Sequence, residues 1–132
     1  MIVWEDPPRR LDAGAKREAR KWLAELDGRL RDEGFAALAD EIAARPDLSH
    51  FLAAVMSLSS HLRGIMLVQP SRLARILSQS PADRMGSIIE AARTAGRSAQ
   101  GEARLMAGLR HLKAEAALLC GLADLGGWWH GP

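Results

Sequence analysis

Aromatic and β-branched residues are scarce in this chain, and their scarcity excludes most sheet folds. The 132 residues include four Trp, two Phe and no Tyr, so that aromatics make up 5% of the whole. Thr94 is the single threonine, and valine occurs three times. Strands need runs of Val, Ile, Thr and aromatic residues, which this composition does not supply. Leu and Ala dominate instead, and because both favour helices, the sequence predicts an all-α fold.

Cysteine pairs, strong net charge and long apolar runs are also lacking. Cys120 is the only cysteine, which excludes an internal disulfide and makes a reducing cytoplasm the expected location. There are 18 Lys and Arg against 16 Asp and Glu, and this small excess does not favour nucleic-acid binding. No apolar run approaches the ~20 residues of a membrane span. The first ten residues include Glu5, Asp6 and two prolines, which does not fit a signal peptide.

Prolines and glycines divide the chain into an arm and a helical domain. Residues 1–11 are predicted to be an extended, loosely held arm, although Trp4 could still dock on the body. Residues 12–127 are predicted to form an irregular bundle of six or seven helices with a long buried helix last. Residues 128–132 read as the truncated start of a following domain.

Apolar residues spaced by three and four positions mark the helices of the first half. Asp12 is the predicted N-cap of the first helix, and Gly34 is predicted to break or bend it. The stripe then continues until 45–46, where a proline ends it. Further N-caps are predicted at Asp47 and Ser60.

The second half contains the most regular pattern. A helix is predicted to start at Ser80 and Pro81, because serine caps a helix and proline suits its first position. Residues 94–101 are small and polar, and are predicted to form a loop. From 102 to 125 two apolar stripes predict a helix that is buried over most of its far half. Gly126–Gly127 is the expected stop of this helix.

Two tryptophans follow the last helix, and each has a large apolar surface to bury. One interpretation is that they await a neighbour that lies outside the chain, and the other is that they fold back onto the bundle. On the first interpretation, the candidate docking surface consists of Leu122, Leu125, Trp128 and Trp129.

The residues that could carry chemistry are dispersed. His50, His61, His111 and His130 lack metal-ligand spacing, so no metal site is predicted. Cys120 follows two leucines and is predicted to be a buried structural thiol. No phosphate-binding glycine loop and no nucleophile elbow occurs in the sequence.

Charged residues of the last helix allow two further interpretations. His111 and Glu115 are four residues apart and are predicted to form a local pair. Arg104, Arg110 and Lys113 line its polar side, which is predicted to be a solvated face; a contact surface for an acidic partner is the alternative.

The last helix carries a resemblance to a known family. The runs 102–110 (EARLMAGLR), 113–119 (KAEAALL) and 122–129 (LADLGGWW) resemble the segment ahead of the catalytic core in bacterial bifunctional glutamine synthetase adenylyltransferase/adenylyl-removing enzymes. Phe51, Ser59–Leu62 and Gln69–Leu73 are similar to the helical lead-in of the same family. The resemblance covers roughly residues 48–129.

The resemblance implies a much longer parent enzyme with two nucleotidyltransferase domains. One removes AMP from a glutamine synthetase tyrosine by phosphorolysis, and the other attaches AMP from ATP. Mg²⁺ and ATP or ADP are the cofactors expected for the parent, and glutamine synthetase and PII signal proteins are its expected partners. The present chain would be an N-terminal helical segment of this enzyme, and it would scaffold or dock the nucleotidyltransferase core.

The catalytic motif of the family is missing from the chain. Family active sites use an S-D-x-D motif whose two carboxylates hold Mg²⁺. The aspartates here lie at positions 6, 12, 27, 32, 40, 47, 83 and 124, and no two are separated by a single residue. No catalytic, cofactor-binding or metal-binding residue is therefore carried over, and the chain alone is predicted to transfer no AMP.

Two alternatives to this reading remain open at the level of sequence. The first is a free-standing helical interaction module, in which the tryptophans and the last apolar stripe form a homodimer or partner interface. The second is a small nucleic-acid binder that uses residues 51–132, where 9 bases face 5 acids. Interleaved acids and the lack of a known motif disfavour the second.

Overall fold

The protein is described here by a computed structural model that covers residues 2–4, 6–11, 16–98 and 101–128. Within these residues the chain forms seven α-helices and no strand, and the predicted all-α fold is confirmed. The helices are α1 (Lys16–Asp32), α2 (Ala36–Ala43), α3 (Pro46–Leu58), α4 (Ser60–Val68), α5 (Ser71–Leu77), α6 (Pro81–Ser98) and α7 (Glu102–Gly126).

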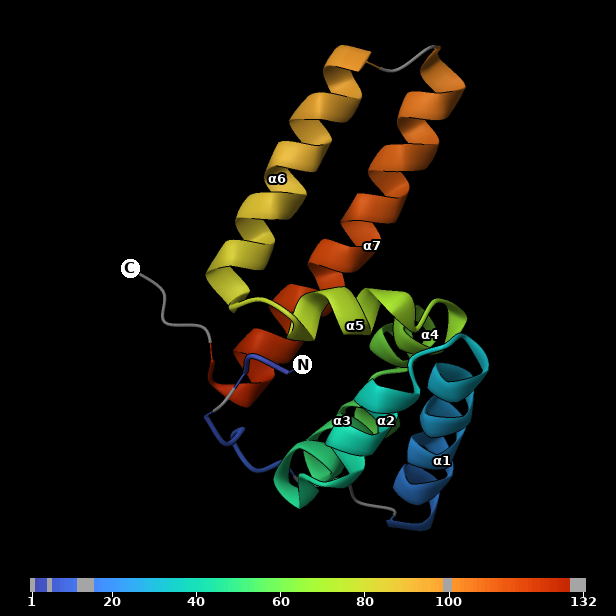
Figure 1. The fold of residues 1–132 in the computed structure, drawn as a ribbon, viewed down its shortest axis with the longest axis vertical. Helices are drawn as coiled ribbons and strands as arrows, with labels where there is room; N and C mark the ends of the chain where they lie inside the picture. Colours follow the sequence, from blue (N-terminus) through green and yellow to red (C-terminus); the bar gives the residue numbers. More distant parts are fainter. Residues whose placement is uncertain (1, 5, 12–15, 99–100, 129–132) are drawn as a thin grey trace.

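The helices form a body and a projecting hairpin. The shorter helices α1 to α5 pack together in the body, and α6 and α7 lie side by side in opposite directions as a long hairpin (Figure 1). The far half of α7 returns into the body, where it contacts α4 and α5. Leu118, Leu119, Leu122 and Ala123 are fully buried there, and the predicted burial of the far half of the last helix is confirmed.

Local signals set most helix ends. Gly34 has a φ of 90°, which favours glycine, and it separates α1 from α2 as predicted. The Oγ of Ser80 accepts a hydrogen bond from the amide of Asp83 at 3.2 Å, as expected of an N-cap. Ser59 caps α4, accepting from Leu62 at 3.1 Å, so the predicted cap at Ser60 is wrong by one residue. Asp12 lies outside the described residues.

Two predicted boundaries are wrong. The helix α3 begins at Pro46, with Arg45 as its N-cap and no side-chain cap, so that Asp47 lies in the first turn rather than at the cap. The predicted loop at 94–101 is also wrong, because α6 continues to Ser98. Ala92 and Ala95 are half-buried in the hairpin, and their small side chains let α6 stay helical where composition alone predicted a loop.

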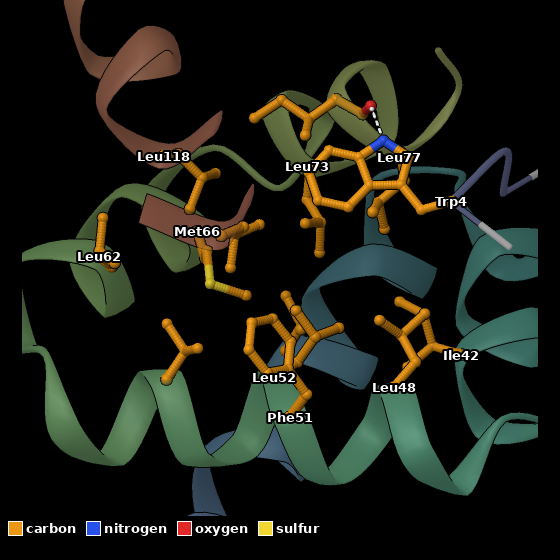
Figure 2. Close-up of a cluster of buried hydrophobic side chains, with 14 of the residues drawn as sticks. Trp4, Ile42, Leu48, Phe51, Leu52, Leu62, Met66, Leu73, Leu77 and Leu118 are labelled. Carbon is orange, nitrogen blue, oxygen red and sulfur yellow. Dashed lines mark hydrogen bonds between the residues drawn. The ribbon is translucent and has the colours of Figure 1, made fainter. Parts of the chain in front are cut away.

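One hydrophobic core joins all of these elements. Leu48 and Leu52 from α3, Met66 from α4 and Leu73 from α5 are all fully buried, and they converge on one centre (Figure 2). Leu118 of α7 reaches the same centre from the other side. Because residues from both chain halves share this core, the helices cannot be divided into two independent units.

The N-terminal arm is part of this core, and the prediction that it is loosely held is wrong. Trp4 is only 2% exposed, and its Nε1 donates to the carbonyl oxygens of Ile76 at 3.1 Å and Gln79 at 2.6 Å (Figure 2). The amide of Ile2 donates to Oε2 of Glu41 at 2.9 Å, and this bond lowers the pKa of that carboxyl. Prolines keep the arm out of a helix, but burial of its apolar side chains still fixes it in place.

The end of α7 gives a first testable prediction, which concerns glycines. A Cβ at Gly126 would collide with the ring of Trp128, whereas a Cβ at Gly108 would meet nothing within 4 Å. Gly126→Ala is therefore expected to lower the free energy of unfolding by about 2 kcal/mol. Gly108→Ala, in the middle of the same helix, should raise it by about 0.5–1 kcal/mol. Urea unfolding of both variants checks this, and equal effects of the two would show that Trp128 does not pack against Gly126.

Candidate functional site

The residues predicted to form a docking surface lie mostly inside the protein. Leu122 is 1% exposed and Trp128 is 8% exposed, so these two do not offer a surface, and their assignment to one is wrong. Leu125 is 38% exposed, and Trp129 lies outside the described residues. Trp128 folds back onto the bundle, which is the second of the two interpretations of the tryptophan pair.

Trp128 is held by partners that are distant in sequence. Its ring lies edge-on to Trp4 and to Phe51, with centroid separations of 4.9 and 5.1 Å. Its Nε1 donates to the carbonyl oxygen of Asp6 at 2.8 Å. Gly127, with a φ of 78°, turns the chain back to allow these contacts. The residue predicted to start a further domain is therefore a component of this core.

A buried charge cluster joins α5, α6 and α7. Glu115 is 1% exposed, and its Oε1 accepts from Nε of Arg75 at 2.8 Å. Its Oε2 accepts from Nε of Arg84 at 2.9 Å, so the carboxylate lies between two guanidinium groups. The Nη2 atoms of the same arginines lie 2.7 and 2.6 Å from the carboxylate. A buried carboxylate is tolerated when opposite charges and hydrogen bonds compensate for the lost hydration.

The predicted pair between His111 and Glu115 does not form. The carboxylate of Glu115 points to the arginines, and Nδ1 of His111 lies 3.2 Å from Nη2 of Arg72. Because a guanidinium can only donate, this nitrogen is the acceptor. Two arginines that are far away in sequence replace the local partner, since they neutralise the charge better in a buried place than a neighbouring histidine on the same helix.

Cys120 is not placed as predicted. Cys120 is exposed, so the predicted burial of its thiol is wrong. It lies on the side of α7 that faces away from the leucines before it.

Across residues 2–4, 6–11, 16–98 and 101–128, no group of three or more His, Cys, Asp or Glu is placed to hold a metal ion. In the same part of the chain, no single helix is long and apolar enough to cross a membrane; α3 and α4 reach that level only when counted together across a bend of 116°.

A cleft lies between the N-terminal arm and helices α1 and α3. This cleft has a volume of about 1050 Å³, and the basic residues Arg9, Arg10, Lys16 and Arg20 line it. A second groove of about 360 Å³ runs along α1 beside α2 and α3, and it shares Arg20 and Leu23 with the cleft. The two hollows therefore adjoin each other on α1.

Sequence reasoning missed both the charge cluster and the cleft. A signal for the cluster exists, because Glu115 falls on the inward side of α7 between Leu112 and Leu119, where an acid needs a partner. The identity of that partner follows only from the packing of α5 and α6 against α7. The cleft has no signal in the sequence, since its walls come from the arm and from two helices.

Known proteins similar to this chain share one name and come from several bacteria. The bifunctional glutamine synthetase adenylyltransferase/adenylyl-removing enzyme of Rhodopseudomonas palustris is 41% identical over 108 residues, which is 82% of this chain and 10% of that enzyme. The enzymes of the same name from Bradyrhizobium diazoefficiens and Brucella suis are 34% identical over 114 residues and 35% identical over 108 residues, and each match covers 11% of the enzyme.

The expected resemblance is confirmed, and the chain is related in sequence to the bifunctional glutamine synthetase adenylyltransferase/adenylyl-removing enzymes. It spans about a tenth of the length of these relatives. No family model matches the chain, and no solved structure matches it.

Proposed function

We propose that this chain is a non-catalytic helical segment of a glutamine synthetase adenylyltransferase/adenylyl-removing enzyme, and that it supports the nucleotidyltransferase core of that enzyme. The observation that carries the proposal is the similarity itself, which extends over 82% of the chain but over only 10% of the relative. A match that covers so small a part of an enzyme fits an accessory segment. The lack of two aspartates separated by one residue supports the non-catalytic part of the proposal.

The parent enzyme would act in the cytoplasm with Mg²⁺. Adenylylation would transfer AMP from ATP to a tyrosine of glutamine synthetase, with release of pyrophosphate. AMP removal would be a separate phosphorolysis, in which phosphate attacks the phosphorus of the tyrosyl-AMP bond and gives ADP and the free tyrosine hydroxyl. PII signal proteins would tune the balance of the two reactions. The role of the present segment would be to hold neighbouring parts of the enzyme in position.

The packing of the chain supports a role as a rigid support. Its arm, its short helices and the far half of α7 share one core, and three helices are joined through Glu115. The hairpin of α6 and α7 projects from this body, and Met106 and Ile89 on it are about half exposed. A rigid body with a projecting helical hairpin is suited to bridge neighbouring parts of a large protein.

Two measurements test the proposal. The chain alone, mixed with adenylylated glutamine synthetase, phosphate and Mg²⁺, is expected to release no ADP, and release of ADP would contradict the non-catalytic assignment. For the supporting role, the Rhodopseudomonas palustris enzyme would be shortened by the 108 residues that match this chain. Its AMP transfer is expected to fall, and to recover in part when the chain is added back. A shortened enzyme with full activity would contradict the supporting role.

The second candidate function is a free-standing helical interaction module. The half-exposed apolar side chains of the hairpin favour it, because such side chains occur at contacts between proteins. Light scattering at several concentrations separates the two candidates. A stable symmetric dimer that loses association on Met106→Glu would support the module, whereas a monomer at all concentrations would support the segment.

A further inference from the structure

We propose that the cleft between the N-terminal arm and helices α1 and α3 is a docking surface for an acidic, partly apolar peptide segment of a partner protein. This inference goes beyond the proposed role in adenylyl transfer and does not depend on it, since it rests on the charge and shape of the cleft alone. Its volume of about 1050 Å³ is at the upper end for a small-molecule site, and it suits several residues of a peptide.

Four exposed cations line the cleft, and their charge is not neutralised by salt bridges among the residues that the structure describes. Arg9, Arg10, Lys16 and Arg20 are exposed, and within the described part of the chain none of them forms a salt bridge. Among the described lining residues the acid is Asp47, whose carboxylate lies 3.6 Å from the guanidinium of Arg45. A hollow with several unpaired cations attracts negative charge and speeds the encounter with an acidic partner.

Some arginines elsewhere in the described chain have acidic partners. Arg31 contacts Asp27 and Asp40 on the surface, and Glu90 lies within 3.8 Å of two arginines on α6. Arg104 and Arg110 on α7 also form no salt bridge within the described residues, and the cations of the cleft differ from them in surrounding one hollow. They lie together on one side of the body, on the arm and the first turns of α1.

The lining is apolar beneath the charges. Leu11 and Leu23 are half-buried, and Ala19 and Ala53 lie deeper in the wall. An isolated phosphate would leave this surface uncovered. Stacking of nucleic-acid bases is limited to the exposed imidazole of His50, because the ring of Phe51 is 3% exposed and packs on Trp128. A ligand with carboxylates and aliphatic side chains matches both parts of the lining.

The second groove adjoins the cleft and extends the lining along α1. The groove along α1 meets the cleft at Arg20 and Leu23, and it continues past Ala24 and Asp27 between α1 and α2. The two hollows together offer more room than the cleft alone. A linear peptide could place its acidic residues near the cations of the cleft and its aliphatic residues in the groove.

The test is an NMR titration of the ¹⁵N-labelled 132-residue chain with three synthetic dodecapeptides. The first alternates Glu and Leu in pairs, the second replaces every Glu by Gln, and the third replaces every Leu by Ser. The first is expected to give saturable shifts of the amides of Ala19, Leu23 and Ala53, and the other two to bind at least about tenfold more weakly.

Charge reversal distinguishes binding of the peptide in the cleft from general attraction between the acidic peptide and a basic protein surface. The double variant Arg10→Glu/Arg20→Glu is expected to weaken binding of the first peptide at least about tenfold, whereas Arg104→Glu/Arg110→Glu on the exposed side of α7 should change it less than about twofold. Near-ultraviolet circular dichroism of the buried tryptophans verifies that both variants are folded.

Several outcomes would overturn the proposal. These are the absence of saturable shifts with all peptides, equal loss of binding in both double variants, and equal or tighter binding of a dodecathymidylate or of polyphosphate. Self-association of the chain that Arg10→Glu/Arg20→Glu abolishes would show that the occupant is a second copy instead. Because the titration measures no AMP transfer, its failure is distinct from a failure of the proposed function.

Discussion

Replacement of Glu115 by alanine is expected to lower the free energy of unfolding by about 3 kcal/mol, which would be among the largest effects of any single substitution in this chain. The carboxylate is 1% exposed and lies between the guanidinium groups of Arg75 and Arg84. Without it, two cations face each other with no compensating charge. The side chain of Arg75 is 37% exposed, and its partial hydration keeps the cost at the lower end of the range for a broken buried pair.

The matched control is Glu90→Ala on α6. Glu90 also contacts two arginines, Arg93 and Arg97, but all three side chains are more than 60% exposed, and the expected change is below about 0.5 kcal/mol. Urea unfolding followed by circular dichroism measures both variants. A loss of less than about 0.5 kcal/mol for Glu115→Ala would mean that the cluster does not join the three helices.

The second large effect is expected for Trp4→Ala, at about 3–5 kcal/mol. Trp4 is 2% exposed, and its ring centroid lies 4.9 Å from that of Trp128. Two backbone carbonyl groups accept hydrogen bonds from its Nε1. Its removal leaves a cavity and also leaves those carbonyls without a donor. The consequence for the fold is that the arm, which carries no helix in its described residues, would detach together with the end of α7.

Two further variants show how much of the effect of Trp4→Ala comes from the lost hydrogen-bond donor and how much is specific to this tryptophan. Trp4→Phe retains most of the apolar area but not the donor, and should cost about 1–2 kcal/mol. Trp22→Ala removes a half-buried ring that lies 4.2 Å from the guanidinium of Arg63, and should cost about 1 kcal/mol. Thermal unfolding of the three variants checks the order. If Trp4→Ala and Trp22→Ala were equally destabilised, the arm would not contribute to the core.

Family relationship and helical content were both predictable, for different reasons. The helical content follows from local preference, since Leu and Ala outnumber the residues that strands require. The relationship follows from the runs of α7, which similar enzymes of several bacteria support. The candidate docking residues were a poorer prediction. Leu122 and Trp128 were assigned to a surface because they are large and apolar, and the same property buried them in the core of the chain itself.

By itself, the sequence determined the class of the fold, the helix ends at Gly34, Ser80 and Gly127, and the burial of the far half of the last helix. These features depend on residues that are neighbours along the chain, so spacing and backbone preference suffice to predict them. Only the tertiary structure decided that Trp4 packs on Trp128, that Glu115 pairs with two distant arginines, and that four cations surround one cleft. These contacts join residues that are tens of positions apart, and their partners are chosen by how the helices pack rather than by any local pattern.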